Sequence, residues 1–173
     1  MTDDLRTDPP LAADERTTLR AFLDFHRDTL RAKTAGLDAD GLAATLAPSD
    51  MTLGGMLRHL TFVEHWWFEQ VFLGREAAEP WASVDWGADP DWEWHTADRL
   101  PPEDLRSSYD EQVARSDAVL DAAPDWDALS QRPSRGGEPF SLRWVVVHML
   151  EEYARHNGHA DLIRQSVDGR VGE

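Results

Sequence analysis

Four long segments of the chain carry apolar residues at spacings of three and four, and none of them alternates with period two. Such spacing predicts amphipathic helices that share one core. The segments span about residues 14–35, 52–73, 101–123 and 141–167. Thr52 and Ser141 are suited to be the N-caps of the second and fourth helices. We therefore expect an all-α fold, a four-helix bundle, an architecture whose core often holds metal sites.

The length of 173 residues suits one domain, which we expect to span residues 1–173 with residues 1–12 flexible. Two connections are long. Residues 75–100 carry four tryptophans among acids and prolines, which favours a folded surface loop or lid between the second and third helices. Residues 124–140 are expected to form a turn or a short hairpin. The Gly54–Gly55 pair lowers helix stability, so we expect close packing or a ligand to need the space there.

Charge and composition argue against several classes of function. The chain has 33 acidic and 17 basic residues, and its formal net charge of −16 disfavours binding to nucleic acid or anionic membranes. No apolar run approaches the roughly 20 residues that span a bilayer, and the N-terminus lacks the apolar stretch of a signal peptide. We therefore expect a cytoplasmic protein. Without cysteine, the chain has no thiolate ligand and no cysteine nucleophile.

The last helical segment places ionisable side chains where core residues are expected. His148, Glu152, His156 and His159 follow one another at spacings of four, four and three, within roughly 80° of the helix circumference. The same face holds apolar residues, namely Val145, Met149 and Ile163. Burying such ionisable groups costs several kcal/mol each unless they are paired, neutral or bound to a metal. A divalent cation would satisfy these groups together.

One ion can bridge Glu152 and His156, because residues four apart on a helix have Cβ atoms about 5–6 Å apart. Catalytic zinc sites typically have three protein ligands and one open position, so a third ligand must come from another helix. His59 is the best candidate, at the edge of the buried face of the second helix. Two plainer interpretations stay open. Each histidine can be a satisfied core residue, and Glu152, Arg155 and His156 can form a surface ion-pair network.

Other ionisable residues on the predicted helices are weaker candidates. His26 lies on the apolar face of the first helix, either as a partner of the site or, more simply, as an ordinary core histidine. Glu64 falls near the centre of the buried face of the second helix, where a lone carboxylate needs a cationic partner. Arg143 or Arg155 is the arginine expected to supply it. Two histidines are expected to face solvent: His65 and His95.

Two segments resemble motifs of the DinB-like superfamily of metalloproteins. The fourth-helix motif of that family is usually His-x-x-x-His-Arg-Gly-Gln, and it resembles HMLEEYARHNGHADLIR. Here His156-Asn157-Gly158-His159 stands at the His-Arg-Gly-Gln position, and Glu152 replaces the first histidine. The second-helix motif resembles LGGMLRHLTFVEHWWFEQVF, which contains His59. The helix order and the long second connection also fit, so the resemblance covers essentially the whole chain.

The resemblance implies a four-helix bundle that binds one divalent metal, zinc or nickel, through His59, Glu152 and His156. This His/Glu/His set is similar to that of mycothiol-dependent maleylpyruvate isomerase, and the chain also resembles an actinobacterial subgroup that includes mycothiol S-transferases. The implied activity joins a low-molecular-weight thiol such as mycothiol to an electrophilic small molecule, with metal coordination favouring the thiolate. Three residues are candidates for orienting ligands or moving protons: His148, His159 and Arg155.

Three functions stay open at this point. The first is metal-dependent thiol S-transfer, in which the sulfur must arrive with the thiol because the chain has no cysteine. The second is metal-assisted hydrolysis by an activated water. The third is a stress-related bundle that binds a metal or a small ligand without turnover. Arg58 or Arg155 is a candidate for holding a substrate carboxylate, and likeness to relatives also implies a homodimer.

Overall fold

The computed structural model describes residues 6–171, and over this range the protein is mostly helical with one small two-stranded sheet. Four long helical segments occupy the ranges expected from the hydrophobic spacing. They are α1 (Glu15–Thr34), α3 (Leu53–Glu64) continued by the π-helix η1 (His65–Phe72), α5 (Pro102–Ala122) and α6 (Leu142–Asp168). Part of the segment expected to be flexible, residues 1–5, lies outside the described residues.

Side-chain caps fix the starts of three long helices, namely α1, α3 and α6. The Thr52 hydroxyl accepts a hydrogen bond from the backbone N–H of Gly55, and the Ser141 hydroxyl accepts one from Trp144. Both caps agree with the sequence prediction, and each satisfies a backbone donor that the first helical turn leaves unpaired. In the same way Asp14 caps α1 through the N–H of Thr17.

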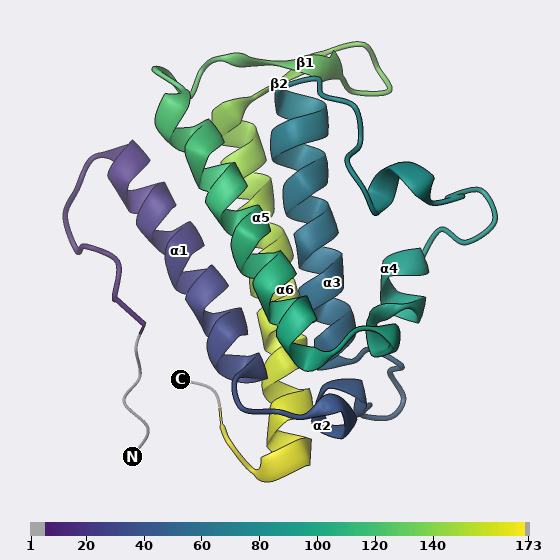
Figure 1. Cartoon of the computed structure of the whole chain (residues 1–173). Coiled ribbons are helices and arrows are strands. Elements are labelled where there is room, and N and C mark those ends of the chain that lie inside the picture. The colour runs from purple at the N-terminus through teal and green to yellow at the C-terminus, as the bar shows by residue number, and fades with distance from the viewer. Residues whose placement is uncertain (1–5, 172–173) are drawn as a thin grey trace.

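The long helices lie side by side (Figure 1). α1 packs against α6, and α3 packs against both α5 and α6. Their facing sides form a continuous apolar core that includes Leu23, Leu57, Leu120, Val145 and Met149. α3 is therefore the central helix for function, because its sides meet α5, α6 and the tryptophan-rich connection.

Both long connections are structured. Residues 129–141 form the predicted hairpin, in which β1 (Leu129–Pro133) pairs antiparallel with β2 (Pro139–Ser141). The connection that follows η1 contains 3-10 turns and the short helix α4 (Trp92–His95), which lies beside α3 in Figure 1. A short helix, α2 (Ala39–Ala43), was not expected.

Close packing explains one of the two neighbouring glycines in α3. A Cβ atom on Gly55 would lie 2.6 Å from the ring of Trp94, well inside van der Waals contact. Glycine at this position therefore lets the tryptophan-rich connection approach the first turn of α3. The sequence prediction of close packing is confirmed here.

A buried ion pair joins α1 to α3. The Arg27 guanidinium donates two hydrogen bonds to Glu64, at 2.8 and 2.9 Å, and their side chains are 1% and 0% exposed. The Tyr153 hydroxyl of α6 also donates to Glu64 at 2.9 Å. The sequence prediction of an arginine partner is confirmed, but the expected arginines were wrong. Arg143 pairs instead with Asp127, and Arg155 pairs with Glu151.

Among residues 6–171, no helix combines the length and the apolar character needed to cross a bilayer.

Candidate metal centre

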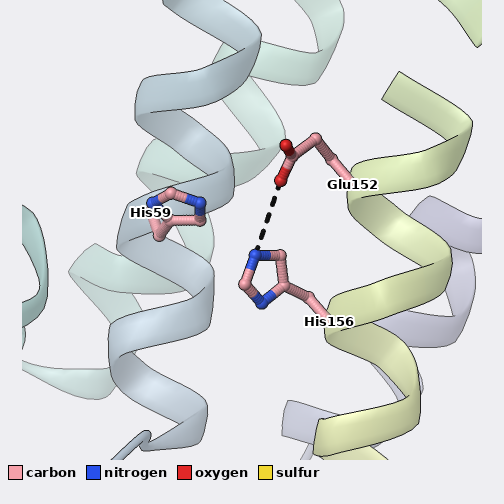
Figure 2. Close-up of side chains that lie close together, drawn as sticks. All are labelled: His59, Glu152 and His156. Carbon is pink, nitrogen blue, oxygen red and sulfur yellow. Dashed lines mark ion pairs between the residues drawn. The ribbon is translucent and has the colours of Figure 1, made fainter. Parts of the chain in front are cut away.

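Three side chains from two helices converge between α3 and α6. His59 comes from α3, and Glu152 and His156 come from successive turns of α6 (Figure 2). One potential ligand atom from each residue lies within 4.8 Å of the others. The structure thus brings together the three residues that the family resemblance assigns to the metal.

The spacing of these atoms suits one small cation. His156 Nε2 lies 3.6 Å from Glu152 Oε2, while two ligand atoms bound to a tetrahedral zinc at about 2.1 Å are roughly 3.4 Å apart. A neutral imidazole, a carboxylate and a second imidazole also form a donor set that zinc accepts. The residues therefore fit a divalent metal.

His59 is held in place by the tryptophan-rich connection. Its Nδ1 lies 2.9 Å from Glu93 Oε1, and its ring stacks on Trp94 with centroids 4.8 Å apart. With the Nδ1 proton donated to the carboxylate, Nε2 presents its lone pair toward Glu152 and His156. Carboxylates commonly fix the tautomer and orientation of metal-binding histidines in this way.

Sequence reasoning missed Glu93. The residue lies in a short helix of a connection that has no periodic pattern, so its burial follows only from the tertiary packing of that connection on α3. One signal was present, since Glu93 stands between Trp92 and Trp94. An acid between two large apolar residues is a candidate for burial, but its partner was not predictable.

The Glu152 carboxylate is surrounded by imidazoles. Contact with His156 lowers the pKa of Glu152 against the opposing effect of burial, and the nearby His148 and His59 lower it further. The side chain therefore stays an ionised carboxylate, which is the form that binds a cation. Its side chain is 22% exposed, so the carboxylate is partly accessible to solvent.

The residues expected to support the site divide into two groups. His148 is close to it, with Nε2 3.6 Å from Glu152 Oε1 and its ring packed against Trp67 and Trp144. His159 packs edge-on against His156 at 6.0 Å. Arg155 lies apart, with its side chain 61% exposed and paired with Glu151.

The remaining histidines follow the predictions only in part. His95 is exposed, as expected. His26 is half-buried, and its Nδ1 lies 3.3 Å from Nδ2 of Asn157, the residue that follows His156 in the sequence. His65 was expected to face solvent, and this was wrong, because its side chain is 2% exposed. The connection that follows η1 covers this side chain, because the backbone N–H of Ala78 donates to His65 Nε2.

Both ring nitrogens of the buried His65 form hydrogen bonds when the imidazole is neutral. Its Nε2 accepts the backbone N–H of Ala78 at 3.3 Å, so Nδ1 carries the proton and donates it to Glu69 at 3.3 Å. Glu69 also accepts a hydrogen bond from Gln112. Burial lowers the pKa of His65 from its ordinary 6.5, although Glu69 opposes this effect.

This burial predicts a loss of stability in mild acid. The unfolded chain takes up a proton on His65 near pH 6.5, whereas the folded protein resists it, so the free energy of unfolding should fall as pH drops below about 6.5. In His65→Gln, urea unfolding at a series of pH values should show a shallower loss. His95→Gln, at an exposed histidine, should retain the loss. An unchanged slope in His65→Gln would remove His65 as the cause.

Comparison with known proteins agrees with this geometry. The family model described as mycothiol-S-transferase matches residues 18–169, which include His59, Glu152 and His156. A search among curated proteins finds no match to the chain. Because the matched region is most of its length, the chain belongs to the mycothiol S-transferase family.

Proposed function

We propose that this protein is a divalent-metal-dependent thiol S-transferase that joins a mycothiol-like thiol to an electrophilic small molecule. The convergence of His59, Glu152 and His156 within 4.8 Å carries the proposal. Family membership supplies the thiol chemistry, since it indicates a mycothiol-related transferase. Zinc is the metal that we favour for a two-imidazole, one-carboxylate set, with nickel as the alternative.

The finer features of the family are proposed with it. The four long helices form a single-domain four-helix bundle, and two copies form a homodimer in the cytoplasm. The absence of cysteine supports the role of the thiol, because any sulfur nucleophile must be brought by the substrate.

The chain's own residues prepare the site for a thiol. When bound, the metal supplies a positive charge that favours the thiolate, the reactive form of the substrate. Glu93 keeps His59 oriented, and Trp94 covers the ring and shields it from water. His148, beside Glu152, is placed to accept the thiol proton or to pass it to solvent, since its side chain is 20% exposed.

An aromatic surface extends from the site. Trp67, Phe140 and Trp144 pack on one another, and two of them hold His148. Trp144 is 44% exposed. Aromatic rings of this kind suit a flat or apolar molecule, so we propose that the electrophile rests here while the thiol sulfur approaches Glu152 and His156.

A conjugation assay tests the function. Zinc-loaded protein is mixed with chlorodinitrobenzene and with one thiol at a time: mycothiol, bacillithiol or glutathione. The thioether product is measured by absorbance and mass spectrometry. We expect the rate with mycothiol to exceed the uncatalysed rate clearly. Glu152→Ala should abolish this excess, and Glu151→Ala, at an exposed neighbouring acid, should retain it. Conjugation with none of the three thiols in metal-replete protein would reject the proposal.

A further inference from the structure

A buried arginine of α3 has no direct ion-pair partner among residues 6–171, although Glu93 lies near enough to act on it electrostatically. Arg58 is 8% exposed, and its Nε is buried without a hydrogen-bond partner. Within residues 6–171, no carboxylate forms an ion pair with it. Its guanidinium lies over the rings of Trp92, at 4.6 Å, and Trp81, at 5.8 Å. Such cation–π contacts recover only part of the cost of removing a guanidinium from water.

The same arginine lines a cavity on the α3–α5 side of the protein. The cavity has a volume of about 480 Å³, within the usual range for small-molecule sites. Its lining residues combine apolar groups, including Pro80, Trp81 and Leu105, with the polar residues Thr61 and Ser108. His59, Glu152 and His156 are not among its lining residues. The cavity is therefore distinct from the candidate metal centre.

We propose that this cavity binds a small organic monoanion through its carboxylate, with Arg58 as the counter-ion. The rings of Trp81 and Trp92 lie near the guanidinium, and its terminal N–H groups form no hydrogen bond within residues 6–171, so these donors are left for a ligand. Those donors match the two oxygens of a carboxylate. The apolar walls then hold the hydrocarbon part of the same molecule. This inference goes beyond the proposed function and does not require it.

The surrounding charges favour one negative charge over several. Glu69, Glu79 and Glu111 also line the cavity, and the whole chain carries a net charge of −16. Glu69 is already paired with Arg75 and Arg115. A phosphate ester or polyphosphate carries more negative charge than a carboxylate and would be repelled more strongly by these acidic residues, so a carboxylate fits better.

One short segment touches both the cavity and the metal centre. Trp92 packs over Arg58, Glu93 holds His59, and Trp94 stacks on the same His59 ring. These three residues lie beside α3 in the tryptophan-rich connection (Figure 1). Arg58, the proposed counter-ion, therefore packs against the segment that orients a candidate metal ligand.

Calorimetric titration of the whole chain with benzoate, phenylacetate and phenylpropionate tests the site. Each acid is compared with its neutral amide and with inorganic phosphate. We expect at least one acid to bind, and its amide and phosphate to bind at least about tenfold more weakly. Arg58→Gln should weaken the acid by a similar factor. Binding of none of the three acids, or tighter binding of phosphate, would overturn the proposal.

Matched variants distinguish binding at Arg58 from binding at the metal centre or at a neighbouring arginine. His156→Ala should bind the acid as the wild type does, because the cavity does not include the metal centre; loss of binding there would assign the acid to the metal. Arg115→Gln removes a half-exposed arginine of the same cavity that is already paired with Glu69, and it should have little effect. Arg58→Lys keeps the charge but loses the planar pair of donors, so it should bind less tightly than wild type. Equal binding by wild type and Arg58→Gln, with both folded by circular dichroism, would reject Arg58 as the counter-ion.

Discussion

Replacing Glu152 by Ala is expected to reduce bound zinc from about one equivalent per chain to a small fraction of that. Loss of an outer hydrogen-bonding partner typically weakens metal binding by roughly 10–100-fold, so loss of a charged ligand should cost more than about 100-fold. The thiol conjugation rate should fall with the metal. The physical reason is that two neutral imidazoles, His59 and His156, cannot replace the negative charge of the carboxylate.

Metal analysis of purified variants checks this expectation, because each variant should lose a different amount of zinc affinity. Glu93→Ala frees the His59 ring but leaves the three ligands, so zinc affinity should fall by roughly 10–100-fold. Asp91→Ala, at an exposed acid of the same connection, should bind zinc as the wild type does. If the double variant His59→Ala, Glu152→Ala still bound a full equivalent of zinc, the metal would have to be held by other residues.

Replacing Arg27 by Met should destabilise the folded protein by about 3–5 kcal/mol. The change leaves Glu64 buried, with 0% exposure and only the Tyr153 hydroxyl as a donor among residues 6–171. Removing an ionised carboxylate from water without a counter-ion is the source of the cost. Urea unfolding followed by circular dichroism, in the presence of a chelator so that metal binding does not contribute, gives the free energy of unfolding.

Two comparisons make this result specific to the buried pair. Arg31→Met removes an arginine of the same helix that is 36% exposed and pairs with Asp110, and it should cost no more than about 1 kcal/mol. The double variant Arg27→Met, Glu64→Leu should recover much of the lost stability, since no unpaired charge is left inside. A loss for Arg27→Met as small as that for Arg31→Met would mean that Glu64 is protonated or hydrated in solution.

The helices and the candidate ligands could be predicted from the sequence because both depend on local spacing. Periodic apolar residues defined the four long helices, and the four-residue separation of Glu152 and His156 placed both on one face of α6. The capping residues Thr52 and Ser141 were equally local. Such features follow from one helix at a time.

Features that depend on packing between segments could not be predicted. The choice of Arg27 for Glu64 depends on how α1 lies against α3, and spacing within either helix carries no information about it. Glu93 reaches His59 only because its connection folds back on α3. The π-helix that begins at His65 also escaped prediction, because apolar spacings of three and four do not distinguish it from an α-helix.

The Arg27–Glu64 pair has a consequence for the metal centre, through the alignment of two helices along their axes. Glu64 and His59 lie on α3, whereas Tyr153 and its neighbour Glu152 lie on α6. Because the Tyr153 hydroxyl bonds to Glu64 deep in the core, α6 cannot slide along α3 without breaking that bond. The distance between His59 and Glu152 is thus set during folding, and the metal need not organise its own ligands. An apolar replacement of the pair would keep a stable interior but remove this fixed alignment, so metal affinity should decline even where the free energy of unfolding does not.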